Sequence, residues 1–203
     1  MIIRRLLGLI LALLLPLGAA SPFAEEGTKS IRTAVFAGGC FWCMEPPYDR
    51  LDGVVETISG YSGGKVANPT YEQVSSGRTG HAEVVQVRYD ASKVSYPQLL
   101  EVFWRNVDPF DAGGQFCDRG NQYRSAIFYA NEREKKLAEE SKRALEQKFG
   151  KDIATQIVPA ATFYPAEDYH QNYYQRNPIR YKFYRYRCGR DQRLEKVWGG
   201  AGR

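Results

Sequence analysis

The chain has 203 residues, of which 43% are hydrophobic and 25% charged, and its formal net charge is +5. This length supports one domain with its own hydrophobic core. Basic and acidic residues are interspersed, which is typical of a solvated surface and argues against a nucleic-acid-binding protein.

The N-terminus has the organisation of a secretory signal peptide. Two arginines at 4–5 precede an unbroken apolar stretch at 6–15, and small residues follow at 18–20. We predict cleavage after Ala20, a linker over residues 21–32 and export to the periplasm. An uncleaved membrane anchor is the alternative, although the apolar stretch is shorter than the roughly 20 residues that a spanning helix needs.

From Thr33 onward, strand and helix patterns interleave in the order β-α-β-β-α-β, which predicts an α+β fold. We expect a two-layer α/β sandwich with an antiparallel or mixed sheet, formed by a single domain over 33–203 with a C-terminal tail from about residue 175. The strand patterns lie at 33–37, 54–62, 81–90, 125–129 and within 153–165, and the helix patterns lie at 40–51, 95–107, 131–150 and 166–178.

The last part of the chain combines basic and aromatic residues. The segment YKFYRYRC at 181–188 resembles a single-strand nucleic-acid surface in composition, because rings stack on bases and arginines bind phosphates. The small net charge and the export signal favour packing in the core or in a strand instead.

Four cysteines, Cys40, Cys43, Cys117 and Cys188, accompany this export signal. Their even number permits two structural disulfides in an oxidising compartment. A chain of this length can stabilise itself by burial, so we favour a redox-active role.

The motif GGCFWC at 38–43 permits three chemistries. Zinc deaminases combine a C-x-x-C with an H-x-E such as His81-Ala82-Glu83, but there the C-x-x-C follows the H-x-E and here it precedes it. A thioredoxin-like thiol-disulfide exchanger would use Cys40 and Cys43 at a helix start and would not need Glu83. An enzyme acting on a particular substrate would use the thiol and the carboxyl together.

Glu83 lies in the clearest strand pattern of the chain, on the same face as Val85, Val87 and Tyr89. If this is the core face, desolvation raises the pKa of the carboxyl and makes it a proton donor near pH 7. A thiolate, a neutral acid and aromatic walls suit a sulfoxide, whose sulfur is attacked, whose oxygen is protonated and whose methyl group is held by rings. The oxygen would then pass to Cys40 as a sulfenic acid.

Six motifs in this order and spacing are similar to those of the A-type peptide methionine sulfoxide reductases: GGCFWC, GYSGG, NPTYEQV, TGHAE, GNQYRSAIF and AEDYHQNY. The resemblance covers roughly Thr33 to Tyr174. It implies a ferredoxin-like plait and the reduction of methionine (S)-sulfoxide, free or in proteins, without metal or bound cofactor. It also implies recycling by thioredoxin or a thioredoxin-like reductant, with oxidised proteins and peptides as substrates; we expect a monomer that binds no nucleic acid.

The resemblance assigns a role to several residues. Cys40 matches the nucleophile, and we expect the start of a helix to lower the pKa of its thiol by about half a unit, with further activation by substrate binding. Glu83 matches the acid. The substrate-binding positions are Phe41 and Trp42 around the methyl group, Tyr71 and Tyr123 as hydrogen-bond donors to the sulfoxide oxygen, and Asp118 in the same pocket.

The resolving cysteine stays open between two main candidates. Many family members resolve from a glycine-rich C-terminal tail, which favours Cys188, while Cys43 is one helical turn from Cys40 and needs little movement. Cys43 could equally pack as a small hydrophobe, and Cys117 is a third possibility. The two histidines, His81 and His170, are expected to be structural.

Overall fold

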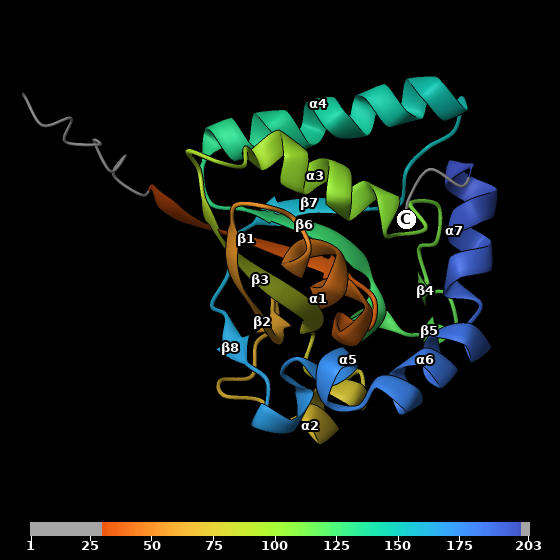
Figure 1. Ribbon diagram of the computed structural model, residues 1–203. Helices are drawn as coiled ribbons and strands as arrows, with labels where there is room; N and C mark the ends of the chain where they lie inside the picture. Colours follow the sequence, from red (N-terminus) through yellow and green to blue (C-terminus); the bar gives the residue numbers. More distant parts are fainter. Residues whose placement is uncertain (1–29, 200–203) are drawn as a thin grey trace, which may run out of the picture.

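The structure, a computed structural model, describes residues 30–199 (Figure 1). The predicted signal peptide at 1–20 and residues 21–29 of the predicted linker lie outside the described residues. The first strand begins at Ile31 and so takes in the end of that linker. Among residues 30–199, no helix combines the length and the apolar character that crossing a lipid bilayer requires.

Six strands form one sheet in the order β7-β6-β1-β3-β2-β8. All neighbours are antiparallel except β6 and β7, which are parallel. The prediction of an α+β fold with an antiparallel or mixed sheet is therefore confirmed, and the sheet is mostly antiparallel. The strand bounds are Ile31–Gly38 (β1), Val54–Ser62 (β2), Ala82–Asp90 (β3), Ser125–Tyr129 (β6), Gln156–Pro159 (β7) and Tyr164–Pro165 (β8), and a separate hairpin pairs Gly114–Gln115 (β4) with Asp118–Arg119 (β5).

Helices α1, α3 and α4 lie together over the sheet, and α5, α6 and α7 continue along one end of the molecule (Figure 1). The main core fills the space between α1, α3 and the sheet. The helix bounds are Phe41–Asp49 (α1), Tyr71–Ser75 (α2), Tyr96–Arg105 (α3), Glu132–Phe149 (α4), Tyr173–Arg176 (α5), Pro178–Arg187 (α6) and Arg190–Trp198 (α7), with 3-10 turns at Asn121–Tyr123 and Asp168–His170.

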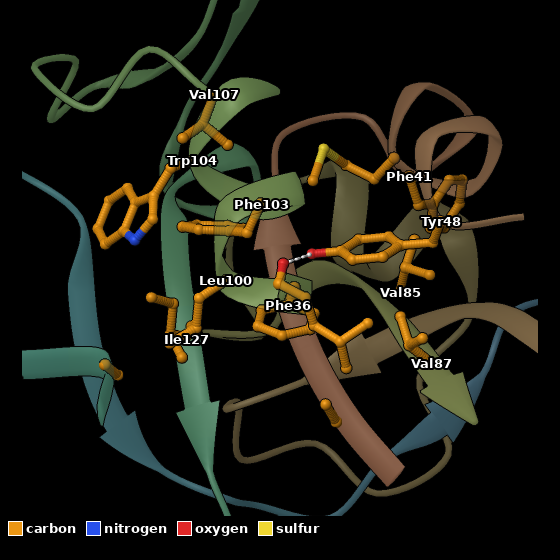
Figure 2. Packing of buried hydrophobic residues seen from close by; sticks show 14 of the residues in the cluster. Phe36, Phe41, Tyr48, Val85, Val87, Leu100, Phe103, Trp104, Val107 and Ile127 are labelled. Atoms are coloured by element: carbon orange, nitrogen blue, oxygen red, sulfur yellow. Dashed lines mark hydrogen bonds between the residues drawn. The ribbon is translucent and has the colours of Figure 1, made fainter. Parts of the chain in front are cut away.

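Aromatic side chains dominate this core (Figure 2). The ring of Phe36 on β1 stacks on Tyr48 of α1, with 5.3 Å between centroids, and on Phe103 of α3, with 5.6 Å. All three are fully buried, and each such side chain contributes roughly 1.5–3 kcal/mol through burial alone. This contact fixes the position of α1, and hence of its first residues, against the centre of the sheet.

The helix predictions at 95–107 and 131–150 are confirmed as α3 and α4, although α3 ends at Arg105, before the predicted end. Ser95 and Gln98 form a capping box at the start of α3. At the start of α4, Asn131 accepts a hydrogen bond from the Glu134 backbone, and Gly150 ends the helix in the left-handed conformation.

The prediction for the C-terminal segment is wrong in part. The YKFYRYRC segment lies in α6 rather than in a strand, and α7 follows after Cys188 and Gly189. The β-propensity of its tyrosines is overridden because α6 turns one side toward the site and the other toward solvent. Pro178 begins α6 at the first helical turn, and the positive φ of Gly189 separates the two helices. The predicted tail is thus a packed part of the domain.

Candidate active site

Two glycines place Cys40 between the end of β1 and the start of α1. Gly39 has a φ of +80°, and a Cβ built there would lie 2.6 Å from the Cβ of Gln115. A Cβ at Gly38 would lie 2.5 Å from the Sδ of Met44. Only glycine fits at both positions, because Gln115 and Met44 are fully buried. The chain can therefore turn sharply here and present Cys40 as the cap of α1.

We predict that Gly39→Ala lowers the free energy of unfolding by about 2–4 kcal/mol, because left-handed strain and overlap with Gln115 add. Gly150→Ala is the matched control, since Gly150 also has a positive φ but has no atom within 4 Å of the added Cβ. It should lose about 1 kcal/mol. Urea unfolding of both variants measures the difference, and equal losses would contradict the proposed close contact.

A small cavity of about 60 Å³ lies beside Cys40. The structure brings together in its wall all seven residues that the sequence placed in one pocket, and adds Tyr184 from α6. The lining consists of Cys40, Phe41, Trp42, Tyr71, Glu83, Asp118, Tyr123 and Tyr184.

Glu83 lies on the core face of β3, which is the condition under which the sequence makes it a proton donor. Val85, Val87 and Tyr89 belong to the main core, and Glu83 itself is 2% exposed. Burial raises the pKa of its carboxyl to about 8, against the effect of a 3.1 Å hydrogen bond from the Phe41 backbone N–H to Oε2. At pH 7 the Glu83 carboxyl therefore carries its proton. The hydrogen bond from Phe41 also holds this carboxyl against the start of α1.

Cys40 and Cys43 are both buried and free, and their thiols share a hydrogen bond. Burial raises the pKa of Cys40, so the expected lowering at the helix start is wrong: desolvation outweighs the half unit that the helix end supplies. The hydrogen bond from Cys40 lowers the pKa of Cys43 to about 6, with burial opposing and the charges of Arg190 and Arg185 assisting. Cys43 is thus the more acidic of the two thiols.

Phe41 and Trp42 form an aromatic wall that other rings hold in place. Trp42 stacks on Tyr173 with 3.8 Å between centroids, and its indole N–H donates to Nδ1 of His170 at 3.1 Å. The centroid of the His170 ring lies 4.9 Å from that of Phe41. Burial lowers the pKa of His170, which keeps the ring neutral and able to accept this bond. His170 thus positions the wall, in line with the expected structural role.

Tyr71 and Tyr123 present phenols to the cavity. Burial raises the pKa of Tyr71 to about 12 and also raises the pKa of Tyr123, and at the high pH where a phenol titrates the Glu83 carboxylate is ionised and assists in both cases. Both hydroxyls therefore remain protonated and can donate a hydrogen bond. The Tyr71 backbone N–H donates to Glu167, which also accepts from Tyr61 and so anchors α2 beside the site.

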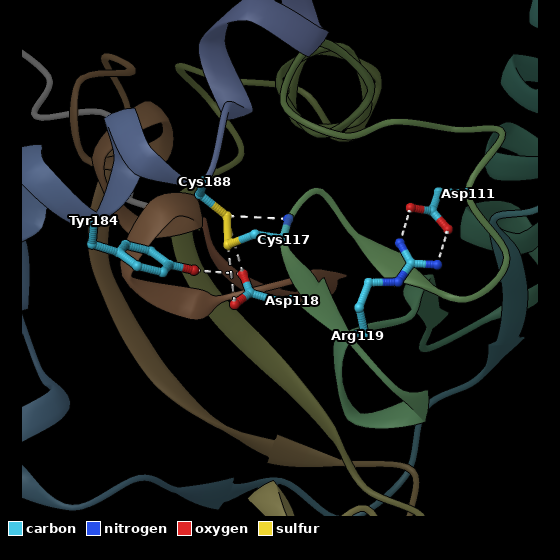
Figure 3. Close-up of a disulfide and its surroundings, with 6 residues drawn as sticks. All are labelled: Asp111, Cys117, Asp118, Arg119, Tyr184 and Cys188. Atoms are coloured by element: carbon cyan, nitrogen blue, oxygen red, sulfur yellow. Dashed lines mark hydrogen bonds and ion pairs between the residues drawn. A yellow bond between two sulfur atoms is a disulfide. The ribbon is translucent and has the colours of Figure 1, made fainter.

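Cys188 forms a disulfide with Cys117, with 4.9 Å between their Cα atoms (Figure 3). Neither of the predicted resolving pairs, Cys40 with Cys188 or Cys40 with Cys43, is the one that the structure joins. Within residues 30–199 the alternative of two structural disulfides is also not realised, because Cys40 and Cys43 are free. The disulfide ties the end of α6 to the hairpin that carries Asp118.

Asp118 connects this disulfide to the cavity (Figure 3). Its carboxylate accepts a hydrogen bond of 2.5 Å from the Tyr184 hydroxyl, and Oδ2 lies 3.9 Å from the Cys188 sulfur. Burial raises the pKa of Asp118, with Tyr184 and Arg190 opposing. Because Asp118 and Tyr184 both line the cavity, the Cys188 sulfur lies close to it.

Sequence reasoning missed Tyr184 and Arg190. Arg190 is 1% exposed, and its guanidinium donates to the carbonyls of Gly38 and Asn106 and lies over the ring of Phe116. No carboxylate among the described residues forms an ion pair with Arg190. Its positive charge lowers the pKa of Cys43 and opposes the raised pKa of Asp118. The helical spacing of tyrosines in YKFYRYRC could have indicated Tyr184; no local signal indicates a buried arginine.

The zinc alternative is not favoured by the geometry. His81 accepts a hydrogen bond from Gly64 at Nδ1, and its Nε2 lies 2.8 Å from the Val66 carbonyl, so both ring nitrogens are engaged away from Cys40. Cys117, Asp118 and Cys188 place three ligand-type atoms within 4.8 Å of one another, but the two sulfurs are bonded together. A disulfide sulfur is not a thiolate ligand.

The cavity, with the free thiol of Cys40 and a buried acid, is that of a thiol-based oxidoreductase. Comparisons with known proteins identify its family. Residues 32–201 match the family model described as peptide methionine sulfoxide reductase. A relative called peptide methionine sulfoxide reductase MsrA, from Halalkalibacterium halodurans, is 53% identical over 173 residues, which are 84% of this chain and 98% of the relative. The chain therefore belongs to the peptide methionine sulfoxide reductase family, and the resemblance seen in the sequence is confirmed.

Solved structures agree with this assignment. The reduced form of Mxr1 from Saccharomyces cerevisiae is similar with a TM-score of 0.70 and 34% identity, covering 76% of this chain and 89% of Mxr1. Mxr1 in complex with Trx2 is similar with a TM-score of 0.51 and 26% identity, covering 73% and 87%.

Proposed function

We propose that the chain reduces methionine (S)-sulfoxide, free or in proteins, to methionine. The observation that carries this proposal is the cavity in which a buried thiol, a buried neutral carboxyl and an aromatic wall meet. Each meets one need of a methyl sulfoxide, namely a nucleophile for sulfur, a proton for oxygen and an apolar surface for the methyl group.

In the first step Cys40 attacks the sulfoxide sulfur while Glu83 protonates the oxygen. The sulfur–oxygen bond of the substrate breaks and the oxygen passes to Cys40, giving a sulfenic acid and methionine. The thiol proton of Cys40 restores the acid form of Glu83, so the enzyme gains one oxygen atom overall. Tyr71 and Tyr123 donate hydrogen bonds to the oxygen, and Phe41 and Trp42 contact the methyl group.

In the second step we assign Cys188 as the resolving residue, because its sulfur lies beside Asp118 at the cavity. Its thiol condenses with the sulfenic acid, releasing water and forming a Cys40–Cys188 disulfide. Cys117 then displaces Cys40, which leaves the Cys117–Cys188 disulfide and a free Cys40. Cys43 is the alternative resolving residue.

The reductant is proposed to be a thioredoxin-like dithiol, with support from the complex of the relative Mxr1 with Trx2. The protein is proposed to act as a monomer, without metal or cofactor. We also propose that the signal peptide at 1–20 directs export. A single domain is proposed over 33–203, and the family match over 32–201 supports this extent. The strand order β6-β1-β3-β2, with α1 and α3 as crossovers, supports a ferredoxin-like plait.

The direct test is to incubate the domain, without residues 1–20, with a peptide that contains racemic methionine sulfoxide and with dithiothreitol, and to follow both diastereomers. Loss of the S form alone is expected. If folded, reduced protein leaves both forms intact but reduces protein disulfides, the reductase proposal is wrong and the thioredoxin-like exchanger using Cys40 and Cys43 replaces it.

A further inference from the structure

Glu45 is a buried acid that the proposed reaction does not use. It lies on α1, three residues after Trp42, and therefore on the same side of the helix. It is 0% exposed and does not line the cavity. Burying a carboxyl is costly unless hydrogen bonds compensate it, so the partners of Glu45 indicate what it does.

The carboxyl of Glu45 joins α1 to two other elements. Its Oε1 accepts a hydrogen bond of 2.9 Å from the Ser59 hydroxyl on β2 and one of 3.3 Å from the Asn172 backbone N–H at the start of α5. Oε2 has no hydrogen-bond partner among residues 30–199. Burial raises the pKa of this carboxyl to about 7, with hydrogen bonds from Ser59 and from the backbone of Asn172 and Tyr173 opposing. The contact with α5 therefore depends on one acceptor atom.

Helix α5 needs this contact because it is short and has no cap of its own. It spans only Tyr173–Arg176, and the side chain of its N-cap, Asn172, accepts no hydrogen bond from the helix. A helix of this length is not stable in isolation, and its first N–H groups lack partners within the helix. Glu45 supplies, from another element, an acceptor of the kind that a capping side chain usually provides.

The same helix carries the ring that supports the aromatic wall. The Tyr173 ring stacks on Trp42 with 3.8 Å between centroids and 8° between planes. Trp42 lines the cavity and Tyr173 does not, so Tyr173 supports the wall from outside the cavity. Helix α1 thus contacts the start of α5 at two points, through the stacked indole of Trp42 and through the carboxyl of Glu45.

Other contacts hold the residues on either side of this point. The side chain of Gln171 is hydrogen-bonded to the backbone N–H and carbonyl of Ser59, and the Tyr174 hydroxyl donates to Asp49 at 2.9 Å. Removing the Glu45 carboxyl would leave these contacts in place. The segment would remain folded, while Tyr173 between them would lose its fixed position against the indole.

We propose that Glu45 is a positioning residue that fits the aromatic wall to a methyl group. It holds the start of α5, Tyr173 then holds Trp42, and the cavity of about 60 Å³ beside this wall favours a methyl group over a larger alkyl group. This inference rests on the function proposed above. Glu45 takes no part in the transfer of oxygen or protons, because it does not line the cavity.

The test measures how well the enzyme distinguishes a methyl from an ethyl sulfoxide. Two peptides of one sequence, with methionine sulfoxide or ethionine sulfoxide, are reduced with dithiothreitol, and kcat/KM for the S form of each gives a methyl-to-ethyl ratio. This ratio is independent of the fraction of folded protein. Wild type should prefer the methyl sulfoxide by roughly tenfold or more, and Glu45→Ala should lower this ratio by about threefold or more.

Two further variants separate positioning from general stability. Glu45→Gln keeps an Oε1 acceptor for Asn172 and should retain the wild-type ratio. Glu134→Ala is the matched control, since Glu134 on α4 is also buried and also accepts a backbone hydrogen bond, from Ala130 at 2.8 Å, but does not line the cavity. It should lower stability and leave the ratio unchanged.

Hydrogen exchange provides a measurement that does not depend on turnover. The backbone amides of residues 172–176 should exchange faster in Glu45→Ala than in wild type, Glu45→Gln or Glu134→Ala. An unchanged ratio in Glu45→Ala would overturn the inference, as would a wild type without preference for the methyl sulfoxide or an equal fall of the ratio in Glu134→Ala. If folded wild type reduced neither peptide, the proposed function would be overturned instead.

Discussion

Cys40→Ser is expected to reduce turnover of methionine sulfoxide by roughly 10⁴-fold or more, to the level of the uncatalysed reaction with dithiothreitol. A serine hydroxyl at this position cannot accept the sulfoxide oxygen to form a sulfenic acid. The variant should fold, because the side chain is small and its position is fixed by Gly38, Gly39 and the start of α1. The decisive measurement is methionine release without reductant.

Fully reduced wild type should release two methionines per chain in that experiment, because exchange with Cys117 frees Cys40 for a second sulfoxide, and Cys40→Ser should release none. Cys43→Ser is the control, since this thiol shares the hydrogen bond with Cys40 but does not line the cavity. It should still release methionine as wild type does. If Cys40→Ser retained this release while Cys43→Ser lost it, the more acidic thiol would be the nucleophile and the assignment would reverse.

Glu83→Gln is expected to lower kcat by about 10²–10⁴-fold, the usual contribution of a general acid. Glutamine keeps the shape of the side chain and can accept the hydrogen bond from Phe41, but it cannot donate a proton to the departing oxygen. In wild type the rate should fall as the pH rises through about 8, because Glu83 then loses its proton. This alkaline limb should be absent from the residual rate of the glutamine variant.

Glu83→Gln should change activity and alkaline stability in opposite directions. The folded-state pKa of Glu83 is raised from its ordinary value of 4.5 to about 8, so the folded protein binds this proton more tightly than the unfolded chain. The associated stability is fully present below pH 4.5 and is lost as the pH rises through 8. Above pH 8, Glu83→Gln should therefore be more stable than wild type, by an amount on the order of a few kcal/mol. Thermal melting at pH 5 and pH 9 checks this, and a glutamine variant that is less stable at pH 9 would contradict the buried acid.

Local sequence determined most of the regular structure. The alternation at 81–90 predicted the strand and grouped Glu83 with Val85, Val87 and Tyr89, although it left open which face is buried, and the cap at Asn131 with Gly150 predicted the ends of α4. These predictions hold because a strand and a capped helix depend on residues that are neighbours in the chain. Helix α1 is a partial exception, since it continues through Pro46 and Pro47, neither of which can donate a backbone hydrogen bond to the helix.

The sequence by itself determined the family, the pocket residues and the helix start at Cys40, because motifs and short-range patterns carry this information. Only the tertiary structure decided which cysteines are paired, which thiol is the more acidic, and that α6 and α7 complete the site with Tyr184 and Arg190. The physical reason is that each of these depends on groups far apart in the chain. Cys117 and Cys188 are separated by 71 residues, and the Arg190 charge reaches Cys43 only because α7 packs against the turn at Gly38.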